Sequence, residues 1–134
     1  MDLGEALIQR LSDDAEVAAI FEDRIFWTLR PQNSDLPALV LSRAGGPPEE
    51  LDLDGETDLV ESTIRGSCFA KRSLQATAGA KAFGDALRHE AEIEDVLFWE
   101  ADVGRPISLG GETTPAGFIH QMVVEVTLRH SPVA

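Results

Sequence analysis

The segment STIRGSCFAKRS (residues 62–73) and the alanine-rich segment QATAGAKAFGDALR (residues 75–88) that follows it indicate a strand that leads directly into a helix. Residues 59–70 alternate between apolar and polar side chains, which predicts a half-buried strand. The alanine-rich segment predicts a helix over about residues 74–89, with Ser73 as its N-cap. Because small side chains allow a close approach, we expect this helix to pack tightly on a sheet.

Two more strands are predicted after this helix, over residues 95–103 and 118–130. In the second, apolar and polar side chains alternate, which is typical of an antiparallel strand with one buried face. The linker between them, residues 104–117, is rich in glycine and proline and is expected to be a loop. It carries two apolar side chains, Ile107 and Leu109, without a periodic apolar face. We therefore interpret it as a candidate partner-contact arm.

Two helices are predicted at the N-terminal side. Apolar residues at helical spacing indicate a first helix from Asp2 or Gly4 to about Leu11. Ser12 is the candidate N-cap of a short second helix that ends at about Phe21. The acidic residues after Ser12 favour this start, because carboxylates stabilise the positive end of a helix dipole.

Two strands and an acidic segment are predicted between these helices and the strand at residues 59–70. Residues 24–28 indicate a short edge strand, and residues 38–43 a strand that follows a proline-bracketed loop. Residues 44–57 are expected to form an acidic loop or hairpin arm.

These elements predict an α+β fold in the order α-(α)-β-β-β-α-β-β. We expect a mostly antiparallel sheet of about four strands, with the helices packed on one face, in a single domain over residues 1–134. The predicted core lies between the main helix and the sheet. It comprises Val60, Ile64, Cys68, Phe83, Leu87, Val124 and Val126.

Composition excludes several classes of function. The chain has 134 residues, of which 43% are hydrophobic, and a net charge of −13, which predicts a globular acidic protein. This charge opposes wrapping of nucleic acid and binding to anionic membranes, since phosphates are bound by clustered basic residues. No apolar run approaches the ~20 residues of a membrane helix. Asp2 and Glu5 are unlike a signal peptide, so we expect the protein in the cytoplasm.

The sequence lacks the residue patterns of common catalytic and metal sites, so we expect no enzyme activity and no cofactor. The DLDGE segment (residues 52–56) lacks the full ligand set of a calcium loop. The histidines are too widely spaced for a zinc site. Cys68 is the single cysteine and lies in an apolar strand pattern, so we expect a buried, unreactive thiol. The carboxylates of residues 90–95 are expected in a solvated turn.

Three pieces of sequence, in this order, resemble the tail-completion or tail-terminator family of long-tailed phages and gene transfer agents. A helix runs into DRIF (residues 23–26), and a proline-bracketed loop leads into LPALVLSR (residues 36–43). A strand that ends in CFAKRS (residues 68–73) then leads into an alanine-rich helix. The resemblance covers roughly residues 5–89. Similar proteins often have a Trp-Ala pair where this chain has Phe69-Ala70.

The resemblance implies a structural virion protein that forms a closed, typically hexameric ring. Such a ring ends polymerisation of the tail tube, joins the tail to the head-completion or stopper protein, and leaves a channel for DNA. The resemblance supplies no catalytic residues. The chain's own acidic residues Asp52, Asp54, Glu56 and Asp58 are candidates for the lumen or a subunit seam, where negative charge would repel DNA. The expected location is the host cytoplasm during assembly and then the head–tail junction of the particle.

Two alternatives stay open at this point. One is an adaptor or head-completion subunit of a related assembly. The other is a small-molecule enzyme with a cleft at residues 104–117, although the sequence offers it no acid–base or metal constellation.

Overall fold

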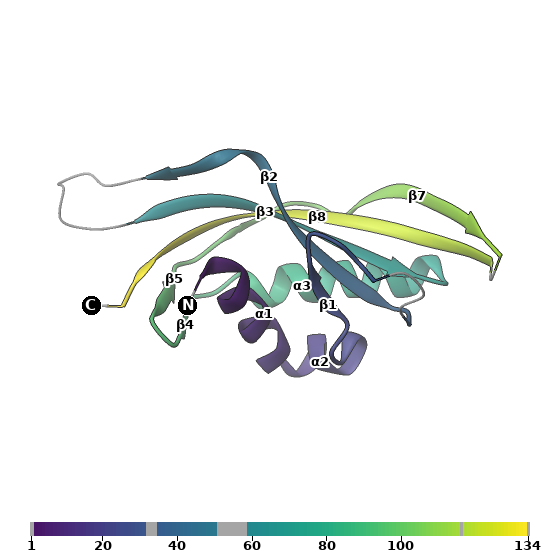
Figure 1. Cartoon of the computed structure of the whole chain (residues 1–134), viewed down its shortest axis with the longest axis horizontal. Helices are drawn as coiled ribbons and strands as arrows, with labels where there is room; N and C mark the ends of the chain where they lie inside the picture. Colours follow the sequence, from purple (N-terminus) through teal and green to yellow (C-terminus); the bar gives the residue numbers. More distant parts are fainter. Residues whose placement is uncertain (1, 32–34, 51–58, 116, 134) are drawn as a thin grey trace.

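The structure is a computed structural model that describes residues 2–31, 35–50, 59–115 and 117–133, with only the backbone for residues 45–50. These residues form three helices and eight strands (Figure 1). The helices are α1 (Leu3–Asp13), α2 (Ala15–Phe21) and α3 (Ser73–Leu87). The strands are β1 (Ile25–Trp27), β2 (Ala38–Glu50), β3 (Val60–Ala70), β4 (Ala91–Ile93), β5 (Val96–Phe98), β6 (Asp102–Val103), β7 (Ile107–Thr114) and β8 (Gly117–Pro132).

All the described strands belong to one sheet, in the order β1-β2-β3-β8-β5-β4, and both β6 and β7 also pair with β8. The strands β3 and β8 run antiparallel at the centre, with Ile64 opposite Val126 and Cys68 opposite Met122. The strand β1 runs parallel to β2, whereas the other pairs are antiparallel. The strand β8 therefore has β3 on one side and β5, β6 and β7 in succession on the other.

The three helices cover one face of this sheet (Figure 1). Their apolar side chains pack against the inward side chains of the sheet and form the core. The bulkiest of the fully buried side chains are Phe21, Phe83, Phe98, Leu7, Leu11, Leu39 and Leu41. Six of the seven predicted core residues are buried, and Val60 is the exception because it lies half-exposed near the end of β3.

Helix α3 lies close to the sheet because small residues make up much of its buried face. A Cβ atom added at Gly79 would lie 2.4 Å from the Cys68 Sγ atom. A Cβ atom added at Gly66 of β3 would lie 2.4 Å from Cε2 of Phe83. Both distances are far below van der Waals contact, so the backbones approach only because these positions are glycine. The predicted tight packing of helix on sheet is confirmed.

The helix starts agree with one of the two predicted starts of α1 and correct two predicted caps. The Asp2 side chain accepts a hydrogen bond from a first-turn backbone N–H and begins α1, as predicted. Asp14 rather than Ser12 caps α2, because α1 continues through Asp13 and absorbs Ser12. Ser73 is the first residue of α3 instead of its cap, and Arg72 at the cap position makes no side-chain capping bond.

The α+β class and the order of the main elements are confirmed, but the predicted count of about four strands was too low. The strand β2 continues to Glu50 instead of ending at residue 43. The strand predicted at residues 95–103 is two strands, and β4 forms where a solvated turn was expected. The expected loop at residues 104–117 contains β7. These segments gain strand structure from backbone pairing with neighbours, which a local apolar pattern does not signal.

Candidate assembly surfaces

The strand β7 pairs with one side of β8 at the right of Figure 1, and residues 120–123 of β8 pair with β3 on the other side. Ile107 lies opposite Val123 in this pairing. The Ile107 and Leu109 side chains are 58% and 54% exposed, so neither is part of the core. We call residues 105–109 the β7 arm. The predicted partner-contact segment is thus an extended strand, and its contact with a partner stays a prediction.

A pocket of about 290 Å³ lies beside the β7 arm. Val123, which is nearly buried, and the exposed Ile107 supply apolar surface to this pocket. At its rim, Arg65 Nη2 lies 2.7 Å from Glu125 Oε1, and both side chains are about half-exposed. Such a solvent-exposed ion pair adds little to the stability of the fold.

Further ion pairs join β8 to neighbouring strands. Arg129 Nη2 lies 2.9 Å from Asp102 Oδ2, and Arg129 Nε lies 3.4 Å from Glu61 Oε2. Arg129 on β8 therefore connects β6 with β3. These carboxylates each have a cationic neighbour and are not arranged as a pair for acid–base chemistry.

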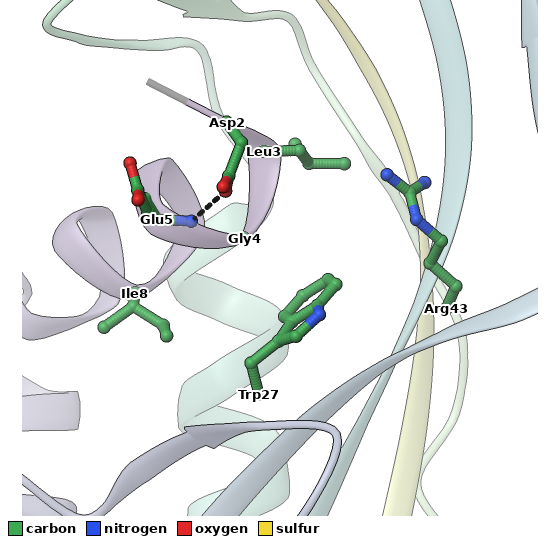
Figure 2. Close-up of a pocket in the computed structure, with 7 residues that line it drawn as sticks. All are labelled: Asp2, Leu3, Gly4, Glu5, Ile8, Trp27 and Arg43. Carbon is green, nitrogen blue, oxygen red and sulfur yellow. Dashed lines mark hydrogen bonds between the residues drawn. The ribbon is translucent and has the colours of Figure 1, made fainter.

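A second pocket, of about 300 Å³, lies between α1 and β1 (Figure 2). The Trp27 side chain lies at its centre, with Ile8 on the helix side and Arg43 on the other. Gly4 lies close to the indole, since a Cβ atom there would be 3.3 Å from Trp27 Cδ2. Glu5 supplies a carboxylate on the helix side. We call this pocket the α1–β1 groove; sequence reasoning missed it because its residues come from three separate elements.

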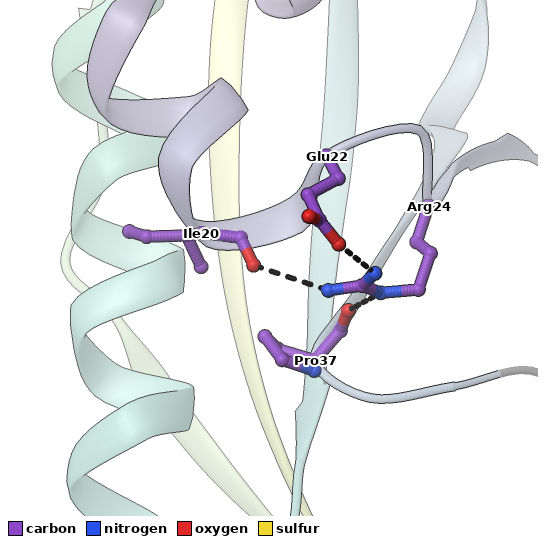
Figure 3. A network of polar contacts seen from close by, with 4 residues as sticks. All are labelled: Ile20, Glu22, Arg24 and Pro37. Carbon is purple, nitrogen blue, oxygen red and sulfur yellow. Dashed lines mark hydrogen bonds and ion pairs between the residues drawn. The ribbon is translucent and has the colours of Figure 1, made fainter.

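Arg24, in the DRIF segment, connects the end of α2 to the start of β2 (Figure 3). Its Nε atom donates a hydrogen bond to the Pro37 carbonyl oxygen at 2.8 Å, and Nη2 donates to the Ile20 carbonyl oxygen at 3.4 Å. Its Nη1 atom also pairs with Glu22 Oε2 at 2.5 Å. Arg24 donates to carbonyl groups near the end of α2 and just before β2. It therefore links the DRIF segment (residues 23–26) to the LPALVLSR segment (residues 36–43).

Arg30 makes contacts that no local sequence pattern signals. Its guanidinium carbon lies 5.0 Å from the centroid of the Phe69 ring. Its Nη2 atom lies 3.7 Å from Glu112 Oε1 on β7. Phe69 thus takes part in a cation–π contact that joins β3 to the segment after β1.

Two titratable groups in the structure are shifted by burial. Burial raises the pKa of the Cys68 thiol to about 12, and the side chain is buried as predicted. A thiol with this pKa is protonated at neutral pH and is a poor nucleophile. Burial, followed by the charge of Arg43, lowers the pKa of His130. The His130 Nε2 atom lies 3.1 Å from Ser62 Oγ.

Three further observations concern predicted and possible sites. Within the part of the chain that the structure describes, no group of three or more His, Cys, Asp or Glu side chains could hold a metal ion. None of the described helices is both long enough and apolar enough to cross a membrane. The predicted lumen residues Asp52, Asp54, Glu56 and Asp58 lie outside the described residues, so their place in the fold stays a prediction.

The fold and surfaces define a small α+β protein with one sheet face covered by helices and with apolar side chains exposed on β7 and β8. A family model described as tail completion protein gp17 matches residues 5–106. This chain belongs to that tail completion protein family, and the resemblance inferred from the sequence is confirmed.

The comparison with solved structures supports the fold independently. A chain of the structure titled "Virion of native gene transfer agent (GTA) particle" matches with a TM-score of 0.69 and 18% sequence identity. The match covers 96% of this chain and 94% of that chain. At this identity the likeness shows the fold. Among curated proteins, no match was found.

Proposed function

We propose that this protein is a non-enzymatic structural component of a phage-like particle that closes the end of the tail. It forms a ring, typically hexameric, that ends polymerisation of the tail tube and joins the tail to the head-completion or stopper protein. The observation that carries this proposal is the match of the tail completion family over residues 5–106. The shared fold with a chain of a gene transfer agent virion adds support.

The exposed apolar surface supports an assembly role. Ile107, Leu109 and Phe118 are each more than 40% exposed, and all three lie on β7 or β8. Ile107 and Leu109 line the same pocket, and exposed apolar side chains that lie together often mark a contact with another protein. In the proposed ring, they contact a neighbouring subunit or the tail tube.

The net charge of −13 supports a channel that DNA passes without specific binding. In this proposal Asp52, Asp54, Glu56 and Asp58 lie at the lumen or at a subunit seam. Changing all four to Lys should leave the free subunit folded and should impair DNA passage or the infectivity of particles. Normal particles from this variant would exclude a lumen role for the four residues.

In this proposal the protein changes its location when the particle assembles. The single domain over residues 1–134 folds in the host cytoplasm and then stays at the head–tail junction of the particle. Its partners are further copies of itself, the tail-tube protein and the head-completion protein. No membrane partner is required.

The decisive experiment is to mix the purified full chain with the tail-tube protein of the same particle, and to examine the mixture by mass photometry and electron microscopy. Mass photometry should show a ring-sized species, and electron micrographs should show rings at one end of tubes of finite length. The chain alone serves as the reference, because subunits of this kind can wait for the tube before they assemble. A strict monomer in both conditions, with tubes of unrestricted length, would overturn the proposal.

A further inference from the structure

The β7 arm and the α1–β1 groove lie at opposite edges of the sheet. The strand β1 ends the strand order on one side, while β7 pairs with β8 on the far side of β3. A contact between two different patches on identical subunits is head-to-tail, and its repetition closes into a ring when the rotation permits. The two surfaces are therefore placed as the two sides of one ring contact would be.

The arm and the groove also match in apolar character. The arm presents Ile107 and Leu109, which are more than half exposed. The groove presents the half-buried Ile8 and Trp27 around a space of about 300 Å³. Gly4 keeps the mouth of this space free of a side chain beside the indole. Docking of the arm would remove apolar surface from water on both subunits.

Charge favours the same pairing. With a net charge of −13, two copies of this chain repel each other unless a basic group meets an acidic one. Most arginines contact a described acidic or carbonyl group, whereas Arg43, Arg72 and Arg105 make no ion pair with another described residue, and of these three only the exposed Arg105 lies in the β7 arm. Glu5 lies on the helix side of the groove and is also exposed. Arg43 lies on the opposite side, so Arg105 is expected at the helix side.

We propose that the β7 arm of one subunit docks into the α1–β1 groove of a second copy of this chain. Ile107 and Leu109 contact Ile8 and Trp27, and Arg105 pairs with Glu5. This inference rests on the proposed ring, and it specifies which two surfaces form its repeated contact.

Cysteine cross-linking tests the contact directly. The double variant Leu109→Cys with Ile8→Cys places one new thiol on each surface, and the buried Cys68 contributes little background. Mild oxidation of the assembled protein should give a ladder of disulfide-linked multimers on a non-reducing gel, up to the full ring. The matched control is Leu74→Cys with Ile8→Cys, because Leu74 is 85% exposed and lies outside the arm. The control should give no ladder.

Charge reversal provides an independent test that does not touch the half-buried Ile8. Arg105→Glu or Glu5→Arg alone should lower the ring association constant by about tenfold or more, and the two together should restore much of it. Lys71→Glu is the matched control for the arm. Glu16→Arg is the control for the groove, since Glu16 also lies in the first turn of a helix. Both controls should assemble as the unchanged protein does.

The outcomes separate this inference from the proposed function. A ring that forms normally, yields no ladder and ignores both charge reversals would overturn the arm-in-groove contact and leave the ring proposal standing. A protein that stays monomeric with and without tube protein would overturn both. A ladder together with charge-swap rescue would establish the contact.

Discussion

The guanidinium carbon of Arg10 lies 5.1 Å from the centroid of the Phe98 ring, so a charged side chain from α1 sits over an aromatic ring of β5. Arg10 is 7% exposed, and its Nη2 atom donates a hydrogen bond to the His89 carbonyl oxygen just beyond α3. Burial lowers the pKa of Arg10, and the charge of Asp14 partly opposes that shift. Its Nη1 atom has no hydrogen-bond partner among the described residues. One side chain thus joins three elements while leaving one donor unsatisfied.

Replacing Arg10 tests which part of this arrangement stabilises the fold. Arg10→Ala should lower the free energy of unfolding by about 2–4 kcal/mol, because it loses packing, the cation–π contact and a charged hydrogen bond. Arg10→Met should cost less than half as much, since it keeps the packed stem and removes the desolvated charge. Urea denaturation of both variants measures the difference. Equal losses would show that the guanidinium, rather than the stem, supplies the stabilisation.

The close approach of Gly66 to Phe83 can be tested by removing volume at Phe83 or by adding volume at Gly66. Phe83→Ala should cost about 3–5 kcal/mol by lost burial and a cavity. Gly66→Ala should cost about 1–3 kcal/mol, because its methyl group would overlap the Phe83 ring. The double variant Gly66→Ala with Phe83→Leu should lose less stability than the sum of the losses measured for Gly66→Ala alone and Phe83→Leu alone. Additive losses in chemical denaturation would show that the ring is not what excludes a side chain at Gly66.

His130 should make stability depend on pH in the neutral range. Its pKa is lowered in the folded state, so below about pH 6.5 the unfolded chain binds more protons at this position than the folded one. The free energy of unfolding should therefore fall as pH drops below about 6.5. His130→Gln should remove this part of the dependence, and the difference between variant and unchanged protein isolates it from the many carboxylates. Parallel pH profiles for the two proteins would contradict the prediction.

Cys68 should be inert in the folded protein. A folded-state pKa of about 12, against a reference of 9.0, means that the thiolate is roughly a thousandfold rarer than for an exposed thiol at pH 8. A disulfide reagent such as DTNB should react with the thiol slowly in buffer and completely in guanidinium chloride. The cysteine introduced by Leu109→Cys is the positive control, since that position is exposed. Rapid reaction of both thiols in buffer would contradict the prediction, because it would mean that α3 and β3 separate often enough to expose Cys68.

The sequence predicted best those elements whose side chains reveal their environment. The alternation around Ile64 and the bulky pair Phe83 and Leu87 correctly placed the central strand, the main helix and the core between them. Val60 was assigned to the core by the same alternation, but it lies near the end of β3, where less structure covers it. The alternation of apolar and polar residues predicts on which face of the sheet a side chain lies. It does not predict how far along the strand that face is covered by the rest of the protein.

What sequence reasoning missed depends on partners distant along the chain. The segment ISLGGETT becomes β7 because β8 offers it a backbone partner, with Ile107 opposite Val123. The α1–β1 groove forms where Trp27 lies close to Gly4. The cation–π contact of Arg30 requires the ring of Phe69 on β3. The expectation that Ile107 and Leu109 lie outside the core is confirmed by their exposure, since isolated apolar side chains in a Gly/Pro-rich segment can be found without the fold, and their contact with a partner stays a prediction.

The pairing of β8 with four other strands has a mechanical consequence. A pull along β8 loads its hydrogen bonds to β3 on one side and to β5, β6 and β7 on the other at the same time, so these bonds must rupture together. A pull across the sheet instead opens one row of bonds after another. The subunit should therefore resist shear along this strand far better than peeling at the three-residue β1 edge. In any assembly that carries tension or internal pressure, the subunit should therefore resist unfolding best when the force runs along β8.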